Sequence, residues 1–293
     1  MLPLRDNIPT DRFPVLTVLL IAINVVVFGW QLTLGSDDYG SSELRILQVP
    51  EEEQAQITYG AIPYRLTHPG EDCGVGAVPR GGQAQVEVVC EGTEEFERAS
   101  QLEAEAGERA PLVLFDDAPW WVTLLTSMFM HGSILHIAGN MLFLWVFGNN
   151  IEDSMGRPRF VAFYLLSGVA AVYAQTLLSP DATVPTIGAS GAVAGVLGGY
   201  ILLHPRARVL TLIFIIFFVT FVEIPAVAVL GIWFVLQLLP AVGQVATPEV
   251  AGESGGVAYL AHVGGFIFGL ALIKLFANRS RDREPPPSIP AYR

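Results

Sequence analysis

Thr186–Gly199 reads TIGASGAVAGVLGG and opens a long apolar run in which only small residues surround one serine, Ser190. Gly191, Gly195 and Gly199 recur at helical spacing, which lets another helix approach almost to backbone contact in a membrane. An isolated apolar GxSG is more often a packing face than a catalytic site. The polar residues found at matching depth in the other apolar segments therefore decide between these two interpretations.

Composition is typical of a polytopic membrane protein. Apolar residues make up 52% of the chain, charged residues make up 15%, and the mean hydropathy is +0.49. The formal net charge of -12 comes mostly from the polar stretch between the first and second apolar segments. No basic patch with interleaved aromatic residues occurs in the sequence, so we expect no nucleic-acid partner.

The apolar runs predict an all-α polytopic membrane protein, because a helix of about 20 apolar residues crosses a bilayer. Two apolar segments, 120–130 and 209–222, are too short to cross and are placed at the membrane interface, the second on the inner side. We expect six membrane-spanning helices, at 14–34, 134–151, 160–178, 186–203, 224–239 and 257–276.

These spans divide the chain into four parts. Residues 1–36 hold the N-terminus and the first span, and 37–118 form an acidic insert with a possible strand at 86–89 and a charged helix at 96–107. Residues 119–277 form the membrane core, and 278–293 form a disordered tail rich in proline and arginine.

The distribution of lysine and arginine sets the expected orientation. With the N-terminus inside, the outer segments hold arginine only within the long insert, and long translocated loops count little in the positive-inside rule. We therefore expect an integral protein of a plasma (inner) membrane, with cytoplasmic N- and C-termini and an extracytoplasmic insert.

Both cysteines, Cys73 and Cys90, lie in this insert. The oxidising outer side favours a disulfide between them. A metal site that adds His68, or two free thiols, are the alternatives, although no paired ligand spacing supports a metal. We accordingly expect no metal site.

Four polar residues lie at one depth of the predicted bundle. Ser190, His262, His136 and Asn140 all fall within about 3–9 Å of the outer ends of their helices, taking a rise of about 1.5 Å per residue. His136 and Asn140 share one helix face. Each residue alone could serve only as a hydrogen-bonding contact between helices, but four at one level of the membrane indicate function.

These residue types fit nucleophilic catalysis. A serine hydroxyl needs a base to take its proton, and His262 can do so. The oxyanion formed by attack on a carbonyl needs donors, which His136, Asn140 and the backbone N–H groups near Ser190 can supply. Gly188 and Gly191 are expected to leave room for substrate backbone, and Gly265 and Gly269 to bring His262 close to Ser190.

On these residues the chain resembles the rhomboid family of intramembrane serine proteases, of the bacterial type with a long first extracytoplasmic loop. Gly188-Ala189-Ser190-Gly191 is similar to the nucleophile motif, and Ala261–Gly265, continuing to Gly269, is similar to the base helix. His131, His136 and Asn140 match an H-x4-H-x3-N pattern, and Gly148, Glu152 and Gly156 match a G-x3-E-x3-G loop.

The resemblance implies a rhomboid-like six-helix bundle with a large extracytoplasmic insert between the first two helices. It implies a Ser190–His262 dyad without an acidic third member, no cofactor, and an oxyanion hole made by His136 and Asn140. Glu152 is expected to be structural, and His131 to organise water or a loop. Implied partners are single-span or polytopic membrane protein substrates and the lipid bilayer; the sequence defines no oligomeric state.

Two features depart from the family pattern. Many members carry an aromatic residue four positions after the nucleophile, where this chain has Ala194, so the histidine must be supported from elsewhere. The insert is also longer than the simplest members need, and it is either a recognition subdomain or a solvated decoration.

Two other functions compete with proteolysis. A catalytically inactive rhomboid-like factor that binds membrane proteins is disfavoured because all four polar residues are present. A transporter would carry ionisable residues midway through several spans, and apart from Glu223 these spans lack them.

Overall fold

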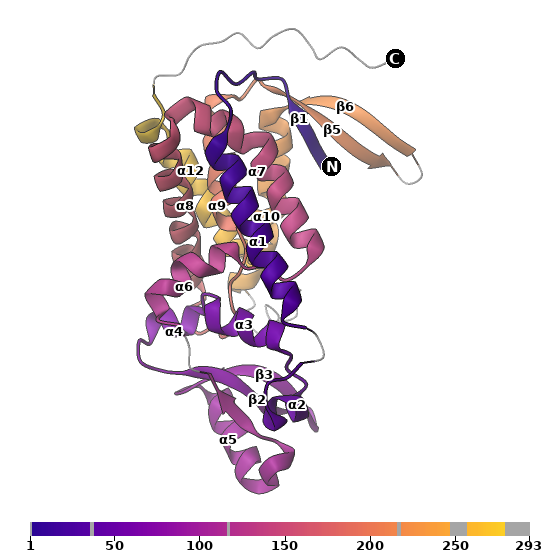
Figure 1. The fold of residues 1–293 in the computed structure, drawn as a ribbon, viewed down its shortest axis with the longest axis vertical. Helices are drawn as coiled ribbons and strands as arrows, with labels where there is room; N and C mark the ends of the chain where they lie inside the picture. The colour runs from indigo at the N-terminus through magenta and orange to yellow at the C-terminus, as the bar shows by residue number, and fades with distance from the viewer. Residues whose placement is uncertain (1, 36–37, 116–117, 216–217, 247–256, 279–293) are drawn as a thin grey trace.

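A computed structural model describes residues 2–35, 38–115, 118–215, 218–246 and 257–278. Figure 1 shows an elongated molecule with a helical bundle in its middle. A small sheet and the N-terminus lie at one end of the bundle, and an α/β unit built from residues 38–115 lies at the other. The expected tail and much of the loop before the last helix fall outside the described residues.

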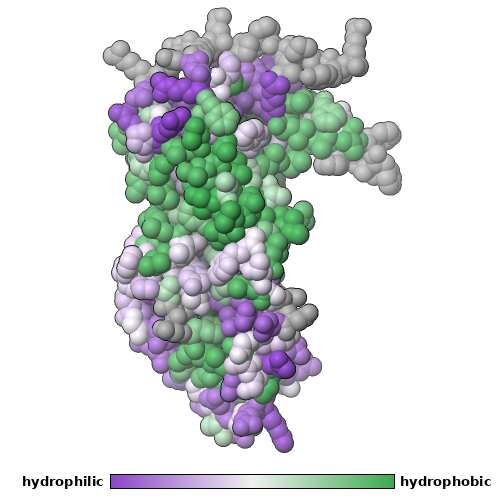
Figure 2. Space-filling model, in the orientation of Figure 1, coloured by the Kyte–Doolittle hydropathy of each residue, from purple (hydrophilic) through white to green (hydrophobic). Residues whose placement is uncertain are grey.

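Five helices are long and apolar enough to cross a membrane. They are α1 (Val15–Thr33), α7 (Ile134–Met155), α8 (Arg157–Leu178), α10 (Ala226–Ala246) and α12 (Tyr259–Phe276). On the face that Figure 2 shows, hydrophobic residues cover this part of the molecule, and hydrophilic residues gather beyond it. The protein is therefore an integral membrane protein with a polytopic helical bundle.

The shorter helix α9 (Ser190–Leu203) lies inside the bundle, and every residue from Gly191 to Tyr200 is buried. Its glycines allow this burial. A Cβ on Gly265 of α12 would lie 2.1 Å from the carbonyl oxygen of Gly191, and one on Gly269 would lie 1.9 Å from that of Gly195. The two helices thus meet backbone to backbone, as small residues permit in a membrane.

The expectation of an all-α chain is corrected by two three-stranded sheets. The segment after α9 forms β5 (Arg208–Ile215) and β6 (Phe218–Pro225), and β1 (Leu2–Asp6) pairs with β5. The segment is rich in β-branched and aromatic residues, which favour strands, and it is too short to span as a helix. Pairing as a hairpin lets its backbone groups bond to each other.

Asp6 joins this sheet to the bundle. Its side chain is buried and accepts hydrogen bonds from the Asn150 amide on α7 and the Tyr200 hydroxyl on α9. Burial raises the pKa of Asp6 to about 6, an effect opposed by the hydrogen bond from Tyr200. The end of α9 remote from Ser190 is thus tied to the N-terminal strand.

The insert has its own hydrophobic clusters, built around residues such as Ile57, Val75 and Val78. Its second sheet has the strand order β3-β2-β4, and Cys73 and Cys90 are paired across β2 and β3 by a disulfide. In chain order its elements are α2 (Ser42–Leu47), α3 (Glu51–Tyr59), α4 (Pro63–Thr67), β2 (Cys73–Arg80), β3 (Gln83–Cys90), α5 (Glu94–Ala106), η1 (Gly107–Arg109) and β4 (Leu112–Leu114).

The apolar segment that follows the insert forms α6 (Trp120–Thr126) and η2 (Ser127–Phe129). These short helices lead into α7, whose start is capped by Ser133 accepting a hydrogen bond from the His136 amide. This segment and the loop 179–189 between α8 and α9 surround the region where the polar residues of the bundle meet.

Candidate active site

Ser190 is the first residue of α9, so its hydroxyl lies at a helix N-terminus. The sequence placed the helix start four residues earlier; in the structure 186–189 belong to the preceding loop. Gly188 has a φ of 118°, which a residue with a side chain rarely adopts, and this conformation turns the loop into the helix. Ser190 is half-buried.

His262 lies opposite Ser190 on α12. Its Nε2 is 2.7 Å from Ser190 Oγ, a hydrogen-bond distance, and the imidazole is buried. The backbone contact between α9 and α12 at Gly265 brings the two side chains this close, because a larger residue there would push the helices apart. The structure therefore brings together a hydroxyl and a base in the arrangement that activates a serine.

Gln237 on α10 completes this arrangement, and sequence reasoning missed it. Its Oε1 lies 2.8 Å from Nδ1 of His262. An amide oxygen only accepts, so Nδ1 carries the proton in this contact and Nε2 is left free to accept one from Ser190. One signal could have found it: Gln237 is a polar side chain within the apolar run 224–239.

Aromatic rings from α10 and α12 surround the histidine and supply the support that Ala194 does not. The ring of Trp233 lies 6.0 Å from that of His262, tilted by 35°, and the ring of Tyr259 lies 6.2 Å away. Trp233 also packs against Phe266. The imidazole is thus held by neighbouring rings as well as by Gln237.

His136 approaches the same place from α7, and Asn140 lies one turn farther along that helix. A Cβ on Gly188 would lie 2.7 Å from Nε2 of His136, so the imidazole packs directly against the Gly188 backbone. Asn140 is buried, and within the described residues its Nδ2 has no hydrogen-bond partner. A buried donor without a partner is costly, and it indicates a group that a bound ligand or transient species satisfies.

His131 holds the loop before Ser190. The Ala189 N–H points to Nε2 of His131 at 3.4 Å, and Nδ1 lies 3.2 Å from the Phe129 carbonyl oxygen. Burial lowers the pKa of His131 to about 4, with a smaller effect from the neighbouring His136. The neutral ring can therefore donate through Nδ1 and accept through Nε2, which fits an organiser of this loop.

Gly188 and Gly191 have no room for a side chain, because protein atoms lie where their Cβ atoms would stand, and the expectation that they leave room for substrate backbone stays a prediction. A Cβ on Gly191 would lie 2.4 Å from the Ala171 side chain of α8, and the space at Gly188 is taken by His136. These glycines serve close packing of the nucleophile loop and helix.

The remaining predicted residues lie away from this cluster. Glu152 is at the far end of α7, where its carboxylate accepts hydrogen bonds from the Leu16 and Thr17 amides and the Thr17 hydroxyl. It thus binds the N-terminal turn of α1, a favourable place for an anion. Cys73 and Cys90 lie in the insert and are bonded to each other.

Taken together, the geometry can support acyl transfer. It provides a serine hydroxyl, a base within hydrogen-bond distance, a third group that orients the base, and an unpaired amide donor one helical turn after His136. These are the parts that form and break an acyl-enzyme.

Comparison with known proteins gives the family. The family model described as Rhomboid domain matches residues 118–279. Rhomboid protein 1, mitochondrial, of Saccharomyces cerevisiae is 30% identical over 153 residues, which is 51% of this chain and 40% of the relative. Rhomboid protease GluP of Bacillus subtilis is 39% identical over 95 residues, which is 32% of this chain and 18% of the relative.

A third relative, Rhomboid-like protein 11, chloroplastic, of Arabidopsis thaliana, is 28% identical over 181 residues, which is 59% of this chain and 60% of the relative. The chain thus spans between 18% and 60% of the length of these three curated relatives.

Proposed function

Because the chain belongs to the rhomboid family, we propose that it is an intramembrane serine endopeptidase that cuts transmembrane protein substrates near the outer face of the membrane. The observation that carries this proposal is the 2.7 Å contact between Ser190 Oγ and His262 Nε2 inside an apolar bundle. Ser190 acts as the nucleophile and His262 as the base of a catalytic dyad.

In the first half of the reaction, Nε2 of His262 takes the proton of Ser190 as Oγ bonds to the substrate carbonyl carbon. The resulting imidazolium then gives that proton to the leaving amine as the peptide C–N bond breaks. In the second half, His262 takes a proton from water, the hydroxide attacks the acyl-enzyme, and the proton returns to Ser190 as the new carboxyl product leaves. Gln237 keeps Nδ1 protonated throughout, so Nε2 remains the exchanging nitrogen.

The oxyanion formed in each half needs donors placed before the reaction begins. The Asn140 amide supplies one, because its Nδ2 is buried and unpaired within the described part of the chain. His136 and the backbone N–H groups at the start of α9 supply others. His131 and Gly188 hold the loop that carries these amides, and Gly191 seats α9 against α8.

The proposed topology counts α9 as a membrane helix with the five long ones, which gives six. At about 1.5 Å per residue its length falls short of the bilayer thickness, so the loop before it reaches into the membrane and leaves Ser190 below the outer surface. Water can then reach the half-buried serine from that side.

The orientation and domain limits are proposed from charge and redox chemistry. Residues 1–36, 37–118, 119–277 and 278–293 form the first span, the extracytoplasmic insert, the catalytic core and the cytoplasmic tail. Arginines 157, 159, 206 and 208 lie at the start of α8 and just after α9, at the end of the bundle that carries β1, and the disulfide lies at the opposite end (Figure 1). Both facts support cytoplasmic termini, and we place the protein in a bacterial plasma (inner) membrane.

The proposal is tested with the full chain reconstituted in liposomes together with a single-span model substrate. We expect wild-type protein to cut the substrate and to be labelled at Ser190 by a fluorophosphonate, since activated serines react and ordinary ones do not. Ser190→Ala and His262→Ala should do neither. Ser167→Ala removes another buried hydroxyl in the bundle and should retain both activities.

The alternative is a catalytically inactive rhomboid-like factor that binds membrane proteins. Folded wild-type protein that binds the substrate yet is neither labelled nor able to cut it would favour this alternative. Equal cleavage by wild type and both dyad variants would remove the assignment of Ser190 and His262.

A further inference from the structure

The loop 179–189 delivers Ser190 to His262, so whatever fixes this loop also fixes the nucleophile. The membrane core holds the last residues of this loop. The Gly188 amide donates to the Ser127 carbonyl oxygen at 2.8 Å, and the Ala189 amide points to His131. These bonds leave the first part of the loop to be held by something else.

The insert supplies that second support through its backbone. Ala61 and Thr186 form an antiparallel bridge, with N–H to O distances of 3.1 and 2.8 Å in the two directions. The Tyr64 amide donates to the Ala182 carbonyl oxygen at 3.0 Å. The insert segment thus runs antiparallel to the nucleophile loop, in contact with it up to four residues before Ser190.

Side chains extend the contact at both ends of this segment. The Thr67 hydroxyl lies 3.2 Å from the Pro180 carbonyl oxygen. At the other end, a Cβ on Gly60 would lie 2.8 Å from the Pro185 side chain and 3.0 Å from that of Ile187. Gly60 has φ -76° and ψ 153°, which any residue adopts, so glycine is required here by close approach, both to the loop and to the Gln56 carbonyl oxygen at 2.3 Å.

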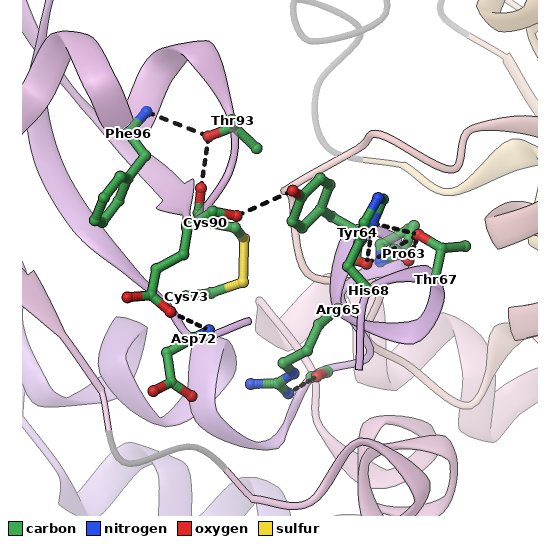
Figure 3. Close-up of a disulfide and its surroundings, with 12 residues drawn as sticks. Pro63, Tyr64, Arg65, Thr67, His68, Asp72, Cys73, Cys90, Thr93 and Phe96 are labelled. Carbon is green, nitrogen blue, oxygen red and sulfur yellow. Dashed lines mark hydrogen bonds between the residues drawn. A yellow bond between two sulfur atoms is a disulfide. The ribbon is translucent and has the colours of Figure 1, made fainter. Parts of the chain in front are cut away.

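This segment is itself fastened to the disulfide end of the insert (Figure 3). The Tyr64 hydroxyl donates to the Glu91 carbonyl oxygen at 3.0 Å, directly after Cys90, and the Tyr64 ring stacks on His68 at 4.1 Å. The disulfide to Cys73 closes the β2–β3 hairpin at that point. The support of the loop therefore rests on a cross-linked unit and not on a free strand.

We infer that Gly60–Thr67, which we call the insert clamp, positions the nucleophile by holding the loop 179–189 against the membrane core. The inference rests on the proposed protease function. It assigns the insert a role in catalysis, because the insert positions Ser190. The insert is then more than a solvated decoration. No residue of the clamp is placed in the dyad or the oxyanion hole, so its members are positioning residues.

The physical reason is the sensitivity of nucleophilic attack to distance. A displacement of about 1 Å at the reacting atoms can cost roughly 100-fold in rate. Loosening the loop should therefore lower the rate of the chemical step while leaving substrate binding within the membrane largely unchanged. Loss of general stability would not produce this separation, because the folded fraction would keep its normal rate constant.

Two clamp variants test the inference in the reconstituted full chain. Gly60→Ala pushes on Pro185 and Ile187, and on the Gln56 carbonyl oxygen at 2.3 Å; Tyr64→Phe removes only the bond to Glu91. The controls are Gly29→Ala on α1, where nothing lies within 4 Å of the added Cβ, and Tyr39→Phe, in the insert but outside the clamp. Fluorophosphonate labelling, kcat, KM and the unfolding temperature are measured for each.

We expect Gly60→Ala to lower kcat and the labelling rate constant by about 10- to 100-fold, with KM changed less than about threefold. Tyr64→Phe should give a smaller decrease of the same kind, and both controls should match wild type. Wild-type kcat and labelling in both clamp variants would overturn the inference. If Gly60→Ala fails to fold, Tyr64→Phe alone decides. Wild-type protein that is neither labelled nor active would instead count against the proposed function.

Discussion

The side-chain oxygen of Gln237 lies 2.8 Å from Nδ1 of His262, on the opposite side of the imidazole from Ser190. The histidine is thus held between an acceptor and a nucleophile. In a serine hydrolase the third group fixes the tautomer and orientation of the base, and a neutral acceptor can do both. The charge-free third group also suits a site inside a membrane, where a carboxylate is costly.

Replacing Gln237 should slow the chemical step. Gln237→Leu removes the acceptor and frees the ring to turn, and we expect kcat to fall about 10- to 100-fold. Gln237→Glu keeps an acceptor oxygen at nearly the same place and should recover much of this loss. Substrate-cleavage kinetics in liposomes measure both, and equal kcat in Gln237→Leu and wild type would show that the contact does not orient the base.

Asn140 should stabilise mainly the transition state of the reaction. Asn140→Ala removes the unpaired donor, and loss of one oxyanion donor costs about 100- to 1,000-fold in kcat. KM should change little because the ground-state carbonyl needs the donor less. Asn149→Ala, farther along the same helix and outside the site, is the matched control. A change confined to KM would point instead to a role in binding.

The contact between α9 and α12 should tolerate no added atom. Gly269→Ala would place a Cβ 1.9 Å from the Gly195 carbonyl oxygen, and overpacking of this kind costs about 1–3 kcal/mol. We expect a lower unfolding temperature and slower labelling of Ser190, because the helices must separate. Gly231→Ala on α10, where nothing lies within 4 Å, should leave both measurements unchanged.

Asp6 should make stability depend on pH. Its pKa is raised by burial from 3.8 to about 6, so between these values the folded protein binds more protons than the unfolded chain. Stability therefore falls as pH rises from about 4 to about 6, by up to roughly 3 kcal/mol. Tyr200 and Arg5 are the polar and charged neighbours that oppose the shift.

Asp6→Asn removes the titrating group and should flatten the dependence of the unfolding temperature on pH across this range. Asp11→Asn, at an exposed position, is the control and should keep the wild-type profile. If Asp6→Asn kept the wild-type profile, the pKa of the Asp6 carboxyl would not differ between the folded and unfolded states.

Much of the helical core could be predicted because the length of an apolar run constrains it strongly. The second and last spans were placed within a few residues of α7 and α12. Ser190, His262 and His136 also lie close together in the structure, because polar side chains at one depth of a bundle have few other partners. The roles of Ser190, His262, His136 and Asn140 remain proposals for the experiments above.

Other features depended on information that a single sequence lacks. The run 209–222 is mostly apolar, and periodicity alone cannot separate a hairpin from a helix there. Gln237 is visible as a polar residue, but its contact with His262 depends on the rotation of α10. The insert clamp pairs Ala61 with Thr186 across a large sequence separation, and no local pattern marks it.

The pairing of β1 with β5 sets an order of events during biosynthesis. Leu2–Asp6 leaves the ribosome long before its partner strand, which begins at Arg208, after α1, α7, α8 and α9 have been translated. Contacts so distant in sequence form late. The N-terminal segment must therefore wait unpaired at the membrane surface until α9 has been inserted, and only then can Asp6 reach Tyr200. Pairing of β1 with β5 therefore takes place only in a chain whose nucleophile helix, α9, is already in place.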